Sequence, residues 1–131
     1  MATELTVKLQ NRAGQLGALT GALADAGVNI KSLAATTGGG QGTVHVVVEE
    51  RDAAKARRAI RAKKYRIAGD RKVVEVRIAD RPGALARVAK LLGEARVNIE
   101  SAYMLAQSKK RTTVALGVKD ARAANKALRR R

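Results

Sequence analysis

The chain repeats a segment of its own sequence at a fixed spacing, and this repeat restricts the folds open to it. The motif Asn11–Gly14 returns as Asp80–Gly83, and Gly27–Ile30 returns as Arg96–Ile99, in both cases sixty-nine positions later. Further identities at this spacing are Leu16/Leu85, Leu23/Leu92 and Ser32/Ser101. A repeat of this kind indicates a structural unit that recurs in space. We therefore expect two similar domains, residues 1–69 and residues 70–131.

Hydrophobic periodicity predicts the same order of elements in both repeats. Apolar residues alternate with polar ones in strand segments and recur every three or four positions in helical segments. The first repeat has strand patterns at 5–9, 28–35, 44–48 and 65–68, and helix patterns at about 16–26 and 52–61. The second has strand patterns at 74–78, 99–105 and 114–118, and helix patterns at about 85–95 and 120–128. Hairpin loops are expected at 37–42 and 108–110.

This order, βαββαβ, predicts an α+β fold in which the second repeat lacks its last strand. Gly27 is expected to end the first helix, because glycine accepts the left-handed conformation found there. Asp52 and Asp120 are expected to cap the second helix of each repeat. A short basic linker is expected around Gly69–Lys72.

The positive charge of the chain lies in two blocks. The net charge is +16. Residues 51–72 hold ten cations and two anions, and residues 109–131 hold nine and one, so each block carries +8. The candidate surface for an acidic protein or a non-specific polyanion consists of Lys55, Arg57, Arg58, Arg61, Lys126 and Arg129. Binding of nucleic acid to this surface would depend strongly on salt.

The repeated motif places a glycine between a strand and a helix in each repeat. Gly14 and Gly83 tolerate positive φ and let the backbone approach a ligand closely. The first amides of the following helices are expected to lack helical partners and to lie at the positive end of the helix dipole. These amides belong to Gln15, Leu16, Ala84 and Leu85. Together they predict a site for the carboxylate of a small ligand.

Polar side chains near the turns are suited to the other end of such a ligand. The side-chain oxygens of Asn11 and Asp80 can accept hydrogen bonds from an ammonium group. Asn29 and Asn98 are expected to start the strands that return beside the two turns. A ligand with both a carboxylate and an ammonium group, such as a free amino acid, fits these donors and acceptors.

On these motifs the chain resembles a tandem ACT-domain protein, over roughly residues 3–68 and 72–129. Asn11–Gly14 with Gly27–Ile30 is similar to the serine-binding ACT module of phosphoglycerate dehydrogenases, where both Asn positions contact the effector. Asp80–Gly83 is similar to the commoner form of the turn. The resemblance implies two ferredoxin-like ACT repeats side by side, with amino acids bound where two ACT modules join along their second strands.

Two departures from the family pattern distinguish the repeats. Ala13 stands where the family usually has proline, which loosens the first turn without removing an amide that it needs. Asp80 stands where the first repeat has Asn11, and its negative charge opposes a carboxylate unless the ligand ammonium or Arg81 offsets it. We expect the first site to bind better.

The resemblance predicts a non-enzymatic regulatory protein that senses a free amino acid at an ACT–ACT interface, and the missing last strand of the second repeat favours a homodimer. The expected ligand-binding residues are Asn11, Gly14, Gln15, Leu16 and Asn29 in one site, and Asp80, Gly83, Ala84, Leu85 and Asn98 in the other. One alternative is a regulatory subunit that docks on a metabolic enzyme through the basic helices. Another is a basic nucleic-acid-associated protein. Sequence-specific RNA binding is disfavoured, because the chain has two Tyr and no Phe or Trp to stack on bases.

Nothing in the sequence indicates catalysis. His45 is the sole histidine, and its alternation with Val44 and Val46 places it on the open face of a sheet. Without cysteine there are no thiolate ligands, and neither a metal nor a cofactor is expected. Residues 1–10 lack a signal-peptide pattern, and no apolar stretch reaches membrane-spanning length. We expect a cytoplasmic protein without a membrane partner.

Overall fold

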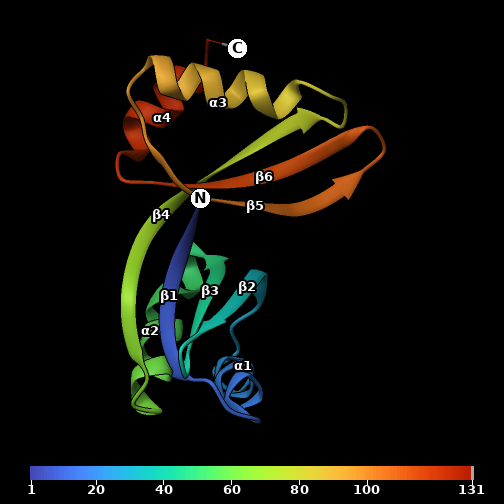
Figure 1. Ribbon diagram of the computed structural model, residues 1–131. Coiled ribbons are helices and arrows are strands. Elements are labelled where there is room, and N and C mark those ends of the chain that lie inside the picture. Colours follow the sequence, from blue (N-terminus) through green and yellow to red (C-terminus); the bar gives the residue numbers. More distant parts are fainter. Residues whose placement is uncertain (131) are drawn as a thin grey trace. The chain divides into compact units, whose positions relative to one another are not determined.

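The computed structural model describes residues 1–130, and the chain divides into two compact units. The N-terminal unit comprises Ala2–Asp70. The C-terminal unit comprises Met1 and the chain from Arg71 onward. Figure 1 shows the elements of both units, coloured by sequence from blue at the N-terminus to red at the C-terminus. The predicted boundary between residues 69 and 70 stays a prediction.

The N-terminal unit has a sheet with two helices. Its elements are β1 (Ala2–Gln10), α1 (Gln15–Asp25), β2 (Ile30–Gly38), β3 (Gln41–Glu49), a 3-10 helix (Glu50–Asp52), α2 (Ala53–Ala62) and the first residues of β4 (Arg66–Ala79). The strand order is β2-β3-β1-β4, and β3 pairs antiparallel with both β1 and β2. The edge strand β2 therefore has its ladder on one side only.

The C-terminal unit repeats this plan. Its elements are the rest of β4, α3 (Ala84–Glu94), β5 (Ile99–Ser108), β6 (Arg111–Val118) and α4 (Ala121–Leu128). The strand order is β4-β6-β5, with antiparallel pairs on both sides of β6. Among the described residues no strand follows α4. The predicted α+β order, with a second repeat that lacks its last strand, is confirmed.

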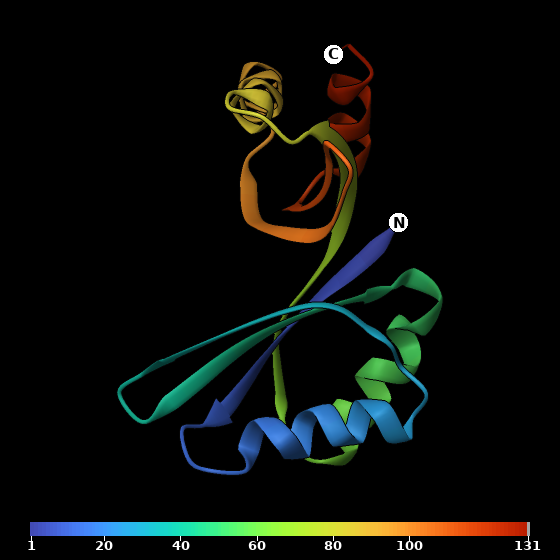
Figure 2. The same cartoon turned by 90° about the vertical axis from the view of Figure 1, so that its right-hand side faces the viewer.

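Each unit has its own apolar core between the sheet and its two helices. The predicted alternation on β1 is confirmed, since Leu5, Val7 and Leu9 all face the core. Leu92 on α3 and Leu116 on β6 are fully or almost fully buried in the other core. Figure 2 shows that both helices of each unit lie on one face of its strands. Small and branched side chains fill these cores, because no Phe or Trp is available.

The predicted linker is wrong. Residues 69–72 lie inside the continuous strand β4, which also contains the strand expected at 74–78 and all of the strand expected at 65–68 except Tyr65. Gly69 approaches the side chain of Thr6 so closely that an added Cβ would lie 3.0 Å from Thr6 Oγ1. Glycine is thus used here for close strand contact and not for a flexible joint.

The ends of the helices differ between the units. Gly27 ends α1 with φ of +75°, as predicted, and Arg96 takes the same place after α3 with φ of +59°. Asp120 caps α4, and its Oδ1 accepts a hydrogen bond from the Ala123 amide at 3.0 Å. The cap expected from Asp52 is wrong: its side chain accepts no capping bond and lies 3.4 Å from Lys55 Nζ.

The helices of residues 1–130 have at most 11 residues, and none of them is long and apolar enough to cross a membrane.

Candidate functional site

The two glycine turns have almost the same backbone geometry. Gly14 has φ of 89° and ψ of −13°, and Gly83 has φ of 89° and ψ of −16°. Both lie in the left-handed region and directly precede a helix, so any side chain there would strain the turn. The sequence prediction of a repeated glycine turn is confirmed.

Two of the four backbone amides expected to bind a ligand already donate hydrogen bonds within the protein. The amide of Gln15 donates to the Arg12 carbonyl, and that of Ala84 donates to the Arg81 carbonyl, both at 3.3 Å. These two amides have no partner within their helices, as expected, but their bonds to residues before the helix leave them unavailable to a ligand. By contrast, no residue within 1–130 accepts a hydrogen bond from the amides of the next two positions, which are Leu16, Gly17, Leu85 and Ala86.

A hollow of about 140 Å³ lies beside the first turn, on the side of β2. Three predicted ligand residues, Asn11, Gln15 and Leu16, line it together. Thr36 and Thr37 of β2 also line it, and the sequence analysis did not include them. Their hydroxyl groups add donors and acceptors to the hollow. In the sequence, the one feature that pointed to these two threonines was their position where the expected strand meets the hairpin loop.

Arg12 and Gln15 interact across the first turn. With its amide turned so that the oxygen faces Arg12, Gln15 accepts from Nε of Arg12 at 3.1 Å. Gln15 is neutral, so the guanidinium keeps its full charge beside the hollow. The start of each turn is held by an equivalent hydrogen bond. The Asn11 amide donates to the Gly40 carbonyl, and the Asp80 amide donates to the Lys110 carbonyl.

Asn29 does not lie beside the turn of its own unit, which corrects the prediction. Strand β2 begins directly after Asn29, opposite Val48 near the end of β3. Asn11 directly follows β1, whose last residue lies opposite Gln41 at the start of β3. Gln41 and Val48 are seven residues apart along β3, so Asn11 and Asn29 are more than about 20 Å apart.

The same correction applies to Asn98 in the C-terminal unit. Strand β5 begins directly after Asn98, opposite Val118 at the end of β6. Asp80 directly follows β4, whose last residue lies opposite Arg111 at the start of β6. Asp80, Gly83, Ala84 and Leu85 therefore share one end of the unit, and Asn98 lies at the other.

The predicted basic surface is partly neutralised within the N-terminal unit. Arg57 binds the carboxylate of Asp70 through two hydrogen bonds, of 2.6 and 3.1 Å. The hydrogen bond with Asp70 raises the pKa of the Arg57 guanidinium. Lys55 lies 3.4 Å from Asp52. Within residues 1–130, Arg58 and Arg61 form no ion pair, and both are exposed.

The single histidine belongs to a polar group on the sheet. His45 Nδ1 lies 3.0 Å from the Thr6 hydroxyl and 3.7 Å from the carboxylate of the buried Glu4. These three residues lie on the face of β1 and β3 opposite the core residues of these strands. The described residues contain no group of three His, Asp or Glu side chains that could hold a metal ion.

A family model for the ACT domain matches the chain twice, over residues 3–64 and 72–130. These two matches cover almost the whole sequence and agree with the two units and their duplicated turns. The chain therefore belongs to the ACT-domain family, as a tandem repeat with a ferredoxin-like fold. The further likeness of the first repeat to a serine-binding module stays a prediction.

Solved structures resemble the chain over nearly its full length. Protein BT0572 from Bacteroides thetaiotaomicron is 25% identical, with a TM-score of 0.82 over 98% of this chain and 86% of that chain. The ligand-free regulatory subunit of aspartate kinase from Thermus thermophilus is 18% identical, with a TM-score of 0.73 over 98% and 91%. The corresponding subunit from Thermus flavus is 15% identical, with a TM-score of 0.69 over 98% and 91%. No curated protein sequence matches the chain significantly.

Proposed function

We propose that this protein is a non-enzymatic regulatory protein that binds a free amino acid between ACT units. The main support is the duplicated turn, in which the amides of Leu16 and Leu85 have no acceptor within residues 1–130. These amides point from the start of a helix, where the dipole favours a carboxylate. Asn11 and Asp80 stand directly before the turns and accept from the ammonium group.

The size of the hollow at the first turn supports a site completed by another ACT unit. Its volume of about 140 Å³ is below the roughly 300–1,000 Å³ typical of pockets that enclose a small molecule. One unit thus provides one wall of a site. The neighbouring edge strand β2 presents backbone groups on its open side, and such edges pair readily with a second strand.

Antiparallel pairing of β2 with β2 of a second copy would complete the site. The start of one β2 then lies next to the end of the other, so Asn29 of one copy approaches the Asn11 turn of its partner. This arrangement accounts for the distance between Asn11 and Asn29 within one unit. The same pairing of β5 strands would bring Asn98 of one copy to the Asp80 turn of another.

Exposed apolar side chains near the turns and on the edge also support an interface. Leu16 and Leu85 are 43% and 41% exposed at equivalent positions, and Met104 on the edge strand β5 is 61% exposed. Burial of such side chains against a second copy is favourable by roughly 25 cal/mol per Å². The proposal therefore includes a homodimer.

Titration calorimetry with each of the twenty amino acids tests the proposal. We expect one or a few of them to bind saturably and to raise the melting temperature, because ligand binding to the native state stabilises it. Leu16→Pro removes one amide donor and is the matched variant for the first turn; Leu85→Pro is its counterpart. The absence of both heat and stabilisation with all twenty amino acids would refute the proposal.

A second candidate is a regulatory subunit that docks on a metabolic enzyme. It is supported by the two similar structures that are regulatory subunits of aspartate kinase, since each is matched over 91% of its length. Recovery of a stoichiometric enzyme with the tagged protein would favour this candidate. Binding of an amino acid by the isolated protein would favour the first proposal. Both candidate functions include a cytoplasmic location for the protein.

A further inference from the structure

Each unit contains a larger hollow that is distinct from the one beside β2. The hollow in the C-terminal unit has a volume of about 480 Å³, and that in the N-terminal unit about 400 Å³. Five lining positions of one hollow recur in the other at a spacing of sixty-nine residues: Lys8/Arg77, Leu9/Ile78, Gln10/Ala79, Arg12/Arg81 and Gln15/Ala84. The two hollows therefore occupy equivalent places in the two repeats.

Both hollows are lined by cations without an acidic side chain. The cations of the C-terminal hollow are Arg77, Arg81, Arg87, Arg111 and Arg129. Those of the N-terminal hollow are Lys8, Arg12, Lys63, Lys64 and Arg66. Like charges gathered in a concave surface repel one another and raise the local concentration of anions. This charge pattern occurs in both units, although only two of the five aligned positions are basic in both.

The arginines of the C-terminal hollow are available to a ligand. Within residues 1–130, Arg81, Arg87, Arg111 and Arg129 form no ion pair, and all four are exposed. Arginine binds phosphate oxygens through a planar pair of donors, which makes it well suited to phosphate groups. Ion pairs elsewhere in the chain, such as Arg57 with Asp70, lie outside both hollows.

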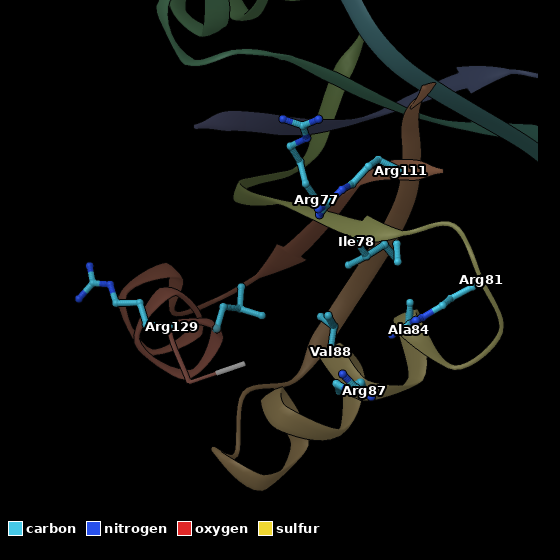
Figure 3. Close-up of a pocket in the computed structure, with 10 residues that line it drawn as sticks. Arg77, Ile78, Arg81, Ala84, Arg87, Val88, Arg111 and Arg129 are labelled. Carbon is cyan, nitrogen blue, oxygen red and sulfur yellow. The ribbon is translucent and has the colours of Figure 1, made fainter. Parts of the chain in front are cut away.

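The floor of the C-terminal hollow is formed by buried apolar side chains. Ile78, Val88 and Leu128 are buried and belong to β4, α3 and α4. Figure 3 shows Ile78 and Val88 facing the space between these elements, with Arg81 extending toward Ala84 at the start of α3. Arg129 points outward in the same view, so its side chain must turn to reach a ligand. An exposed arginine makes such rotamer changes within nanoseconds.

The volume and the lining decide which kind of anion fits. Both volumes lie in the range of about 300–1,000 Å³ that is typical of small-molecule pockets. Single-stranded nucleic acid is usually held by stacking of bases on aromatic side chains. The C-terminal hollow has no aromatic lining residue among those described, and the N-terminal one has only Tyr65. We propose that each hollow binds a small ligand with two or more phosphate groups.

This site is separate from the proposed amino-acid site and does not depend on it. In the N-terminal unit the two hollows share Leu9, Gln10, Arg12 and Gln15, but the smaller one extends to Thr36 and Thr37 of β2 and the larger one to residues 63–66. The C-terminal hollow is lined by Arg81 and Ala84 but not by Asp80 or Leu85. Variants for the test can therefore be chosen away from the residues proposed to hold an amino acid.

Calorimetric titration with inorganic triphosphate at physiological ionic strength tests the proposal. We expect saturable binding with two sites per chain. The double variant Arg87→Gln/Arg111→Gln is expected to weaken one site at least about tenfold and to leave the other unchanged. Lys63→Gln/Arg66→Gln is expected to do the reverse. Retention of one site by each variant, with an unchanged circular dichroism spectrum, shows that the loss is not due to unfolding.

Arg58→Gln/Arg122→Gln is the matched control, because it removes two exposed arginines outside both hollows. If this control weakens binding as much as the hollow variants do, binding is simple ion exchange and the proposal is wrong. The absence of saturable binding would also overturn it. A DNA duplex tests whether the basic hollows bind the phosphates of a nucleic acid instead. If the protein binds the duplex and triphosphate does not displace it, the basic residues serve nucleic-acid binding and the proposal is wrong.

Discussion

Arg57 on α2 binds Asp70 on β4 through both oxygens of the carboxylate, with Nε–Oδ2 at 2.6 Å and Nη2–Oδ1 at 3.1 Å. The pair connects the second helix of the N-terminal unit to the strand that follows it. Because the Asp70 side chain is 38% exposed, solvent screens the pair. We expect Asp70→Asn to lower the free energy of unfolding by about 0.5 kcal/mol, measured by urea denaturation.

The neighbouring Arg58 provides the control for this pair. It is exposed and forms no ion pair within residues 1–130, so Arg58→Ala is expected to leave the unfolding free energy nearly unchanged. Arg57→Ala should match Asp70→Asn in sign, and the double variant should lose less than the sum of the two. Fully additive losses would show that the pair contributes nothing to stability.

The end of α3 holds an arginine in a conformation that suits glycine. Arg96 has φ of +59°, whereas Gly27 occupies the equivalent place after α1 with φ of +75°. The left-handed conformation costs a residue with a Cβ roughly 1–2 kcal/mol, and glycine loses part of this advantage through its greater freedom in the unfolded chain. We expect Arg96→Gly to raise the free energy of unfolding by about 0.5 kcal/mol.

The reverse substitution at Gly27 is the matched test. Gly27→Ala has room for the added Cβ, whose nearest neighbour is Lys55 Nζ at 3.8 Å, so the loss isolates the backbone strain. We expect it to lower the unfolding free energy by about 1 kcal/mol. Chemical denaturation of both variants decides the matter, and a destabilised Arg96→Gly variant would contradict the argument.

Asp120 provides a third test, at the start of α4. Its Oδ1 accepts from the Ala123 amide at 3.0 Å, which satisfies one of the unpaired donors of the helix. Asp120→Ala is expected to cost about 1 kcal/mol of unfolding free energy. Asp120→Asn keeps an acceptor oxygen and should cost clearly less. Equal losses in the two variants would show that the charge, and not the cap, stabilises the helix.

Most of the fold could be predicted because the apolar pattern is periodic in most of the elements. The alternation around Leu5 and Val76 and the helical spacing around Leu19 and Leu92 give the order of strands and helices directly. The continuity of β4 could not be found in this way. Residues 69–72 contain glycine and three charged residues, a composition typical of linkers, and the close contact of Gly69 with Thr6 depends on strand pairing.

The candidate site was predicted in part, for a related reason. Asn11, Gln15 and Leu16 are neighbours in sequence, so their shared turn follows from local structure. The position of Asn29 depends instead on the register of β2 against β3, which a single sequence does not reveal. The two basic hollows were missed because their cations come from segments far apart in the chain, such as Arg81 and Arg129.

The proposed composite amino-acid site makes the sharpest prediction. If β2 pairs with β2 of a second copy, each site takes Asn11 from one copy and Asn29 from the other. Asn11→Ala and Asn29→Ala should then each abolish tight binding, since either change damages both sites of a homodimer. A dimer of one copy of each variant keeps one site with both asparagines intact. We expect a mixture of the variants to recover binding.

The recovery follows from counting sites, and calorimetry of the mixture measures it. Random exchange of subunits makes about half of the dimers mixed, and each mixed dimer should bind one ligand with the affinity of the unchanged protein. Mixing Asn11→Ala with the double variant Asn11→Ala/Asn29→Ala is the control, because every site in these dimers lacks Asn11 and no recovery is expected. Loss of tight binding in Asn98→Ala but not in Asn29→Ala would replace β2–β2 pairing by β2–β5 pairing. If Asn11→Ala and Asn29→Ala both fail to bind and their mixture, with subunit exchange verified, does not recover, a site built from two copies is excluded.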